Sequence, residues 1–384
     1  MKTIYLDNNA TTSVAPEVFE AMKPFLTELW GNPSSMHTFG GQVARHIERA
    51  REQVADLLGA ENPSEIIFTS CGTESNNTAF HSALATARDK HKVITTSVEH
   101  PAVLNPAKQL AVQGREVAFI PVDGMGRLDL SEIERAIDGR TALVSVMWAN
   151  NETGVVFPVE RIAEMCEERG VPFHVDAVQA AGKIPIDLKK APITFLSISG
   201  HKLHAPKGVG VLYVRRGTPF SPFIVGGHQE HSRRGGTENV ASIVAIGKAC
   251  EMAISRMDEE RVKVTKLRDR LEKGILDIIP RSFIHGDTQH RLPNTTNIGF
   301  EAVEGEAILL LMNEYGICAS SGSACTSGSL DPSHVMIAMG IPFTRAHGSI
   351  RFSLSRYSTD EEIDFVLKVL PGIIQRLREL SPVS

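Results

Sequence analysis

Short apolar runs rich in β-branched residues recur through the first half of the chain, and longer stretches separate most of them. Each run is continuously hydrophobic, which is typical of strands buried on both faces of a sheet. Most spacers are long enough for the crossover helix that parallel neighbours require. The runs cover residues 65–70, 92–97, 116–122, 142–149, 172–178, 193–199 and 209–215. The pattern predicts an α/β fold with a mainly parallel central sheet covered by helices, and its short last spacer predicts a hairpin or an antiparallel insertion.

The second half of the chain carries a different pattern. Residues 240–275 are charged and have few strand signals, which predicts a long helix, and strand-like runs follow at 294–300 and 349–355. A chain of 384 residues is also too long for one compact core. We therefore expect a large domain of residues 15–257 and a small α+β domain of residues 1–14 and 258–384.

Two helices have recognisable local signals. The apolar residues of 43–58 fall along one stripe, as in an amphipathic helix. Thr359 and Glu362 have the spacing of a capping box ahead of a second helix. Pro371 and Gly372 are expected to interrupt or kink that second helix.

Charge and hydropathy narrow the range of partners. A net charge of −5 and an isoelectric point near 6.3 argue against nucleic acid or anionic membrane as the main partner. No apolar run reaches the roughly 18 residues that a membrane helix needs. The first residues lack the apolar core of a signal peptide, so we expect a cytoplasmic protein.

The spacing of the five cysteines does not predict a set of disulfides. They stand at positions 71, 166, 250, 318 and 325, with no CxxC and no zinc-like spacing, so neither structural disulfides nor an intrinsic metal site is expected. Cys71, Cys166 and Cys250 lie in apolar or helical surroundings, which predicts inert packing. Cys325 lies in an Ala/Ser/Gly-rich stretch, 319–329, for which we expect a mobile loop.

Two charged residues stand at strand exits. Lys202 ends the sequence SGHK after an apolar run, where partial burial would make a lysine nucleophilic enough for a Schiff base. The alternative is a solvated loop lysine. Asp176 lies inside the apolar run HVDAVQ, where it needs a cation such as a protonated pyridine nitrogen. The alternative is an aspartate that caps the next helix.

Two further strand exits carry polar groups. Residues 69–76, TSCGTESN, have the backbone amides and hydroxyls of an anion site at a helix start, although such turns are common. His100 follows another run and could stack on a flat ring, or be a hydrogen-bonded structural histidine. In chain order these exits supply a phosphate turn, a stacking ring, an aspartate and a lysine.

With these motifs in place, the sequence resembles the class V aminotransferase-like enzymes of fold type I, and among them the cysteine desulfurases of NifS and IscS type. The resemblance covers nearly the whole chain, and its NNATT and WANNETG forms are closer to the NifS branch. Its motifs are YLDNNATT at 5–12, GNPSS at 31–35, FTSCGTESNN at 68–77, WANNETG at 148–154, HVDAVQ at 174–179, SISGHK at 197–202, APKG at 205–208, RRGGTEN at 233–239, SSGSACTSGS at 320–329 and SIRFSLSRY at 349–357.

The resemblance implies pyridoxal 5'-phosphate as the cofactor. It implies that Lys202 forms the Schiff base, Asp176 pairs with the ring nitrogen and Gln179 bonds the ring hydroxyl. His100 would stack on the ring and assist proton transfer. The residues implied to bind the phosphate are Gly72, Thr73, Ser199 and His201.

The same resemblance implies the substrate site and a homodimer. Thr237 would reach the phosphate of the other subunit. Asn151, also expected at the cofactor, and Arg351 would hold the carboxylate of L-cysteine, Arg351 through a bidentate pair. The alternative for Arg351 is an exposed strand arginine.

Sulfur removal needs a nucleophile as well as the cofactor. A thiolate that attacks the substrate sulfur becomes a persulfide and leaves alanine, and Cys325 is the cysteine that looks free to do so. Cys325 could also ligate an iron–sulfur cluster during transfer. Another pyridoxal-phosphate lyase, an aminotransferase or a non-catalytic sulfur scaffold are the competing interpretations. The acceptor, an iron–sulfur scaffold for nitrogen fixation or for general assembly, or tRNA thiolation, stays open.

Overall fold

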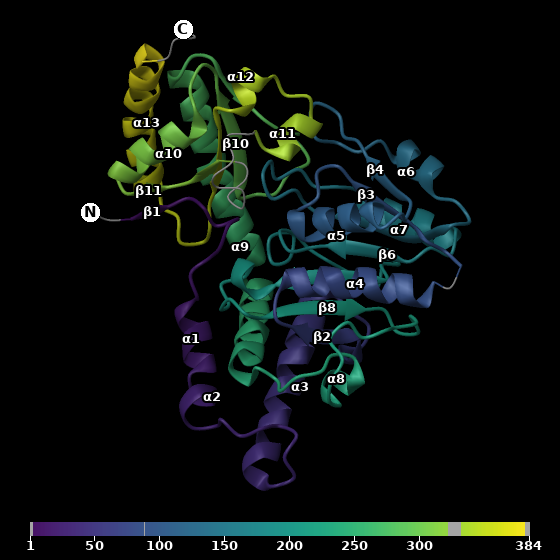
Figure 1. Ribbon diagram of the computed structural model, residues 1–384. Coiled ribbons are helices and arrows are strands. Elements are labelled where there is room, and N and C mark those ends of the chain that lie inside the picture. Colours follow the sequence, from purple (N-terminus) through teal and green to yellow (C-terminus); the bar gives the residue numbers. More distant parts are fainter. Residues whose placement is uncertain (1–2, 88, 322–331, 381–384) are drawn as a thin grey trace.

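A computed structural model describes residues 3–87, 89–321 and 332–380 (Figure 1). Its centre is a seven-stranded sheet with the strand order β2-β8-β7-β6-β5-β3-β4. The strands are β2 (Ile66–Thr69), β3 (Lys92–Thr96), β4 (Val117–Ile120), β5 (Thr141–Met147), β6 (Phe173–Asp176), β7 (Phe195–Ser199) and β8 (Gly210–Val214). Each of the seven apolar runs contains one of these strands, so those predictions are confirmed.

The strand directions agree with the prediction of a mainly parallel sheet, but the predicted burial is wrong for one strand. β8 is antiparallel to both β2 and β7, and every other neighbouring pair is parallel. The antiparallel insertion is therefore β8. The prediction that all seven strands are buried on both faces is wrong for β4, where Phe119 is exposed. β4 is an edge strand, so its apolar residues are covered less completely.

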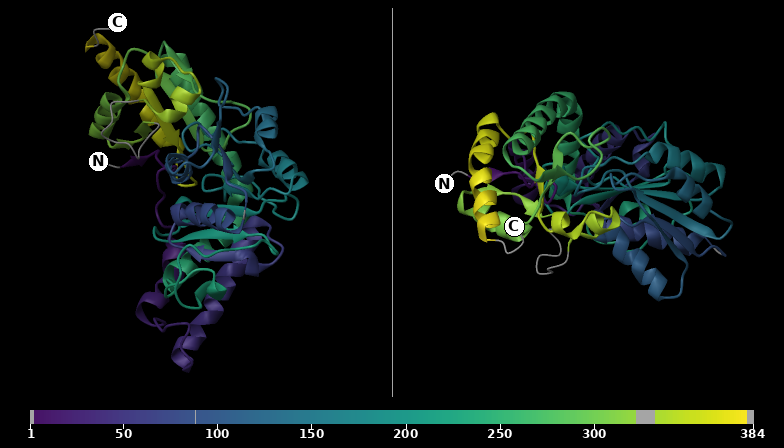
Figure 2. Two further views of the ribbon diagram at one scale, coloured as in Figure 1. Left: turned by 45° about the vertical axis from the view of Figure 1, so that its right-hand side comes forward. Right: turned by 90° about the horizontal axis from the view of Figure 1, so that it is seen from above.

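Helices cover both faces of this sheet, as the view from above in Figure 2 shows. One face packs against α4 (Gly72–Thr86) and α5 (Pro101–Val112). The other packs against α3 (Thr38–Leu58), α6 (Leu130–Ala136), α7 (Val159–Glu168) and the first half of α9 (Val240–Ile278). The stripe predicted in 43–58 is buried in α3, and the long helix predicted at 240–275 is α9.

A second apolar core lies beyond the middle of α9. It is built on an antiparallel sheet of order β12-β13-β10-β9, on the pair β1 and β11, and on α10, α13 and the second half of α9. The elements are β1 (Ile4–Tyr5), β9 (Ser282–Ile284), β10 (Thr295–Phe300), β11 (Ile317–Cys318), β12 (Ser320–Ser321), β13 (Ser349–Ser353), α10 (Gly305–Glu314) and α13 (Asp360–Leu380). The predicted runs at 294–300 and 349–355 contain β10 and β13.

Short helices complete the described chain. They are α1 (Pro16–Met22), α2 (Pro24–Thr27), η1 (Pro63–Glu65), η2 (Gly200–Lys202), α8 (Gln229–Ser232), α11 (His334–Ala338) and α12 (Phe343–Ala346). Within the three described ranges, no helix combines the length and apolar character needed to cross a membrane. In the same ranges, no His, Cys, Asp and Glu side chains gather in threes where a metal ion could bind.

The local predictions for the last helix have different outcomes. The backbone amide of Thr359 donates to Glu362 at 3.2 Å and the amide of Glu362 donates to Thr359 Oγ1 at 3.3 Å, so the capping box is confirmed. The predicted interruption at Pro371 is wrong, because α13 continues past it to Leu380. Burial of Leu370, Ile373 and Ile374 against the second core stabilises the helix on both sides of the proline. Most of the predicted mobile loop at 319–329, including Cys325, lies outside the described residues.

Candidate active site

A large cavity with many polar residues in its wall opens at the carboxyl ends of β2, β5, β6 and β7. Its volume is about 420 Å³, within the roughly 300–1,000 Å³ typical of cofactor sites. Ligands in open α/β sheets bind at this edge of the sheet. Ten of the predicted site residues line it, namely Gly72, Thr73, His100, Asn151, Asp176, Gln179, Ser199, His201, Lys202 and Arg351.

Lys202 ends the 3₁₀ turn η2 that follows β7. Its ammonium group donates to the backbone oxygens of Asn9, at 2.5 Å, and Ala10, at 2.7 Å. The N-terminal segment is itself attached to this turn, because the backbone amide of Thr12 donates to the oxygen of His201 at 2.9 Å. Lys202 is therefore a half-buried, positioned lysine, and the alternative of a solvated loop lysine is wrong.

Asp176 is the last residue of β6 and is buried. Asn76 Nδ2 donates to one carboxylate oxygen at 2.8 Å, and the backbone amide of Val178 donates to the other at 3.0 Å. The second bond caps the turn after β6. No helix lies in the described residues 177–194 between β6 and β7, so the alternative of a helix cap is wrong, and the cofactor interpretation stays a prediction. Both oxygens keep lone pairs for a cation in the cavity.

The predicted phosphate turn is the start of α4. Cys71 is its N-cap and provides no side-chain cap, so the first amides of the helix point to the cavity without that competitor. Gly72 has to be small, because a Cβ there would lie 2.9 Å from Val178 Cγ2. The prediction of inert packing is confirmed for the buried Cys166 and Cys250 but wrong for Cys71, which lines the cavity.

His100 is the N-cap of α5. The backbone amide of Ala102 donates to its Nδ1 at 3.1 Å, so the proton of the neutral ring is on Nε2. Burial lowers the pKa of His100, with Lys202 nearby acting in the same direction and Asp176 opposing. The structural interpretation is thus correct, and the ring lines the cavity at the same time.

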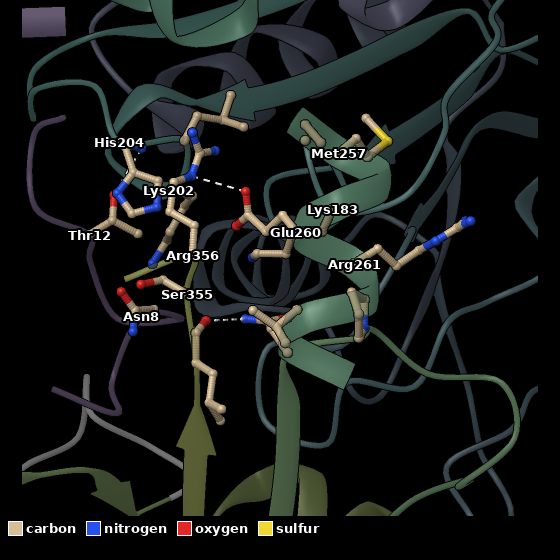
Figure 3. A pocket seen from close by; sticks show the side chains of 17 residues that line it. Asn8, Thr12, Lys183, Lys202, His204, Met257, Glu260, Arg261, Ser355 and Arg356 are labelled. Carbon is tan, nitrogen blue, oxygen red and sulfur yellow. Dashed lines mark hydrogen bonds and ion pairs between the residues drawn. The ribbon is translucent and has the colours of Figure 1, made fainter. Parts of the chain in front are cut away.

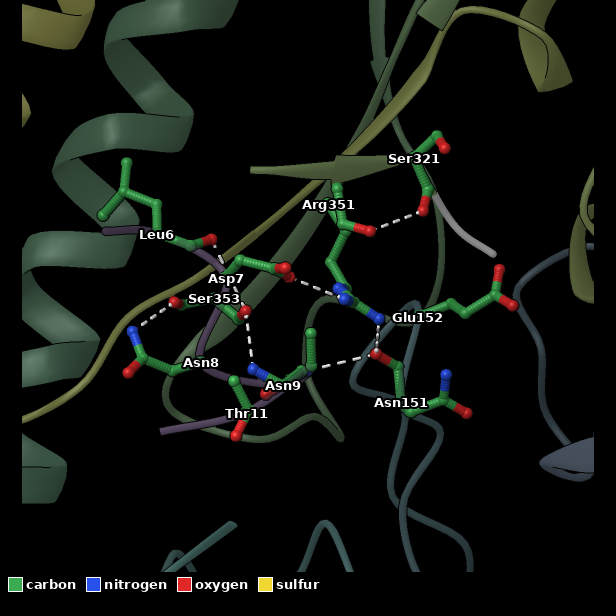
Figure 4. Close-up of polar contacts among 12 residues, drawn as sticks. Leu6, Asp7, Asn8, Asn9, Thr11, Asn151, Glu152, Ser321, Arg351 and Ser353 are labelled. Atoms are coloured by element: carbon green, nitrogen blue, oxygen red, sulfur yellow. Dashed lines mark hydrogen bonds and ion pairs between the residues drawn. The ribbon is translucent and has the colours of Figure 1, made fainter. Parts of the chain in front are cut away.

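Arg351 lies on β13 and reaches the cavity from the second core (Figure 4). Its side chain is 3% exposed and pairs with Asp7 at 2.7 Å, so the alternative of an exposed arginine is wrong. Its Nη1 donates to the backbone oxygen of Asn151 at 3.0 Å. Its Nε has no hydrogen-bond partner among the described residues.

The N-terminal segment connects these groups, which reasoning from local motifs missed. Asn9 Nδ2 donates to Thr295 Oγ1 at 2.9 Å, and its backbone oxygen accepts from Lys202 and from Gln179 Nε2, the latter at 3.0 Å. Asn9, Asn76 and Glu152 all line the cavity and were not singled out. Their only signal was a place inside the motifs NNATT, FTSCGTESNN and WANNETG.

Among the predicted site residues that the structure describes, Thr237 is the one that does not line the cavity. It is exposed and lies in a separate hollow of about 180 Å³, beside Arg234 and Glu230. Arg234 pairs with Glu74, in the first turn of α4, at 2.9 Å. The segment that carries Thr237 is therefore fastened to the outer side of the phosphate turn.

Comparison with known proteins identifies this arrangement. The aminotransferase class-V family matches residues 4–366. The chain belongs to that family. It is 61% identical over 382 residues to the cysteine desulfurase of Trichormus azollae, covering 100% of this chain and 95% of the relative. It is 59% identical, with the same coverage, to the cysteine desulfurase NifS of Azotobacter vinelandii.

Solved structures agree with the family. A NifS-like protein superimposes with a TM-score of 0.92 at 41% identity, covering 98% of this chain and 100% of that one. The apo cysteine desulfurase of Thermococcus onnurineus NA1 gives 0.87 at 27% identity, covering 98% and 95%. The predicted fold type I is confirmed. This class-V chain is a pyridoxal-phosphate-dependent enzyme of the cysteine desulfurase kind.

The residues of the cavity fit pyridoxal phosphate. The start of α4 offers amides to a phosphate, Asp176 offers a carboxylate to a protonated ring nitrogen, and Lys202 offers an amine between them. Gly72 lets the helix start lie close to Val178 and Ser199, since a Cβ there would be 2.9 Å from Val178 Cγ2 and 3.5 Å from Ser199 Cβ. The donor set thus matches the phosphate, the ring nitrogen and the aldehyde of the cofactor.

Proposed function

We propose that this enzyme takes sulfur from L-cysteine, carries it as a persulfide on Cys325, and passes it to a protein that assembles iron–sulfur clusters. The observation that carries the proposal is the single cavity shared by Lys202, Asp176 and Arg351. The amine of Lys202 can bind an aldehyde cofactor, and the carboxylate of Asp176 can pair with the ring nitrogen of that cofactor. The guanidinium of Arg351 can pair with the carboxylate of an amino acid. The full-length identity to cysteine desulfurases supports the choice of cysteine.

Different residues of the cavity are proposed to bind the aldehyde, the ring nitrogen and the phosphate of the cofactor. When bound, pyridoxal phosphate withdraws electrons from the substrate and so acidifies its Cα–H bond. Lys202 would hold the cofactor through its Nζ and, once released, could move a proton at that atom. Asp176 would keep the ring nitrogen protonated. Gly72, Thr73, Ser199 and His201 would bind the phosphate.

Arg351 and Asn151 bind the substrate. The guanidinium of Arg351 is buried and already oriented by Asp7 and by the backbone oxygen of Asn151. Its unpartnered Nε is one available donor for a carboxylate. Asn151 contributes its side chain to the same cavity, where it contacts substrate and cofactor.

His100 contributes a proton. Because its Nδ1 accepts from the amide of Ala102, Nε2 is the ring atom that carries and gives the proton. Burial keeps the free ring neutral near pH 7, since its pKa is lowered. A neutral Nε2–H stacked against the cofactor can donate to the substrate and recover the proton later.

Cys325 is the proposed sulfur acceptor and lies outside the described residues. Its thiolate attacks the substrate sulfur, the new S–S bond forms, and the electron pair of the broken C–S bond stays with the carbon skeleton. That skeleton takes up protons and leaves as alanine, while Cys325 is oxidised to the persulfide. An iron–sulfur cluster under assembly is cargo that Cys325 could ligate during transfer.

We further propose a homodimer in which Thr237 completes the phosphate site of the partner. Thr237 is exposed and separate from the cavity of its own chain. Trp30, 69% exposed, and Met36, fully exposed, are apolar side chains that a partner would cover. Light scattering after size-exclusion chromatography measures the oligomeric state, and a fully active monomer would contradict the proposal.

We also propose a biological process, a cellular location and a domain division for this protein. The NNATT and WANNETG forms and the NifS relative support a role in nitrogen fixation, and the net charge of −5 supports a protein without nucleic-acid or anionic membrane partners. A cytoplasmic location is proposed with them. Two separate apolar cores joined by α9 support the division into residues 15–257 and residues 1–14 with 258–384, except that the segment with Val335, Met336 and Met339 packs in the first core.

Mass spectrometry after one turnover without reductant tests the proposed function. A gain of one sulfur on the peptide that contains Cys325, together with one equivalent of alanine, is expected. A sulfur on another cysteine would contradict the role of Cys325. Alanine without any protein-bound sulfur would contradict the persulfide.

A further inference from the structure

A second half-buried lysine, Lys183, lies behind the wall of the cavity. Lys183 lines a small hollow of about 20 Å³ between the N-terminal segment and α9, and not the main cavity, which Gln179 lines (Figure 3). The hollow holds about one water molecule. Lys202 borders both spaces, so Lys183 is separated from the proposed cofactor by the side chain of Gln179.

The contacts of Gln179 have a direction. Lys183 Nζ donates to Gln179 Oε1 at 2.7 Å, and Gln179 Nε2 donates to the backbone oxygen of Asn9 at 3.0 Å. An ammonium group has donors only, and a carbonyl oxygen accepts only. The oxygen of the amide therefore faces Lys183, and its NH₂ group, with one hydrogen still available, faces Asn9 and the cavity.

We propose that Lys183 is a positioning residue that fixes the amide of Gln179 with its N–H group toward the ring hydroxyl of the cofactor. The proposal rests on the proposed role of Gln179. If the amide turned over, Oε1 would face the oxygen of Asn9 and Nε2 would face an ammonium group. Lys183 and the backbone oxygen of Asn9 both disfavour the reversed amide. Removing Lys183 leaves only the constraint from Asn9.

The charged surroundings of Lys183 do not change this direction. Burial, with Lys202 acting in the same direction and Glu260 opposing, lowers the pKa of Lys183 to about 7. A neutral amine can still donate to Oε1, and the backbone oxygen of Asn9 only accepts, so Gln179 keeps its orientation on both sides of that pKa. The charged and titratable groups around the hollow are Lys202, His204, Glu260, Arg261 and Arg356.

A double-mutant cycle separates positioning from a general effect of charge. The variants are Lys183→Met, which has a similar length but no donor, Gln179→Ala, and the combination. The dissociation constant of pyridoxal phosphate and the visible absorbance maximum of the holoenzyme are measured. Lys183→Met is expected to raise the dissociation constant about tenfold and shift the absorbance when Gln179 is present, and to change neither in the Gln179→Ala protein.

The matched control is Lys190→Met, since Lys190 is 83% exposed and is not among the residues that line the hollow; no change is expected. Equal effects of Lys183→Met with and without Gln179 would mean that Lys183 acts by charge or packing, and would overturn the proposal. A wild-type protein that carries no lysine-bound cofactor would overturn the proposed function as well, which distinguishes the two failures.

Gln179→Glu tests the orientation without altering Lys183. A carboxylate at position 179 still pairs with Lys183 and preserves the fold, but it offers no hydrogen to the cavity. We expect the same loss of pyridoxal phosphate affinity as in Gln179→Ala. Binding as tight as in the wild type would mean that an oxygen of residue 179 faces the cofactor, which contradicts the proposal even if Lys183→Met fails to fold.

Discussion

Glu230→Gln is expected to destabilise the protein strongly, because Glu230 is half of a buried ion pair that holds a strained turn. Its carboxylate accepts from Arg51 at 2.7 and 3.0 Å and from the backbone amide of Phe68 at 3.0 Å. Both charged side chains are 3% exposed. Glu230, His231 and Ser232 have φ angles of 48°, 56° and 64°, which are unfavourable for residues with a side chain.

The magnitude follows from what the substitution leaves behind. Removing one partner of a buried ion pair typically costs about 3–5 kcal/mol. Glutamine still accepts one hydrogen bond from Arg51 or Phe68, so we expect a loss of about 3 kcal/mol in the free energy of unfolding. Arg51→Met added to Glu230→Gln removes the charge that is left without a partner. The double variant should therefore lose about 2 kcal/mol less than the sum of the two single variants.

Urea unfolding followed by circular dichroism measures these free energies, and cofactor absorbance in the same samples reports the phosphate site. Phe68 precedes the phosphate turn and Glu230 precedes Thr237, so cofactor release is expected at lower urea in Glu230→Gln. Asp187→Asn, in a surface pair with Lys190, is the control and should be silent. A loss below about 1 kcal/mol, or strictly additive variants, would refute the reasoning.

Four further outcomes are expected. Borohydride should fix pyridoxal phosphate to Lys202 and not to Lys183 in a peptide map, and Lys202→Ala should keep some cofactor but lose turnover. Cys325→Ala should still change the cofactor spectrum on adding L-cysteine, yet release essentially no alanine. Thr237→Ala should weaken cofactor binding by roughly 1–3 kcal/mol, measured by dialysis against cofactor. Burial raises the pKa of Glu99 to about 8, so the wild type should lose stability as pH rises through that value, and Glu99→Gln should not, as urea unfolding at pH 6 and pH 9 would report.

The sheet and most of the cavity could be predicted because both depend on short-range pattern. Buried strands need continuous apolar runs, and the residue after such a run lies at the edge of the sheet whatever the rest of the chain does. Asp176 and Lys202 were found in this way. The motif resemblance supplied Arg351, whose strand comes from the second core.

The contacts across long sequence distances could not be predicted. Asp7 is 344 residues from Arg351, and Asn9 is 193 residues from Lys202; no local pattern relates them. Pro371 shows the opposite error. A rule about one residue predicted a break or a kink. The break is absent, because burial of the flanking turns of α13 outweighs the one hydrogen bond that proline removes.

The charges around the cavity explain why it suits two anions. Lys202, Arg351 and the start of α4 are positive, whereas four carboxyl groups, Asp7, Asp176, Glu99 and Glu152, lie in or next to the same region. Four ionised carboxylates would repel a phosphate and a substrate carboxylate. Burial, however, raises the pKa of Glu99 to about 8 and that of Glu152 to about 7, so near neutral pH Glu99 is mostly uncharged and Glu152 partly so. Of the other two, Asp7 pairs with Arg351 at 2.7 Å and Asp176 is proposed to pair with the ring nitrogen of the cofactor, so the amides at the start of α4 meet an arriving anion with fewer unpaired carboxylates beside them.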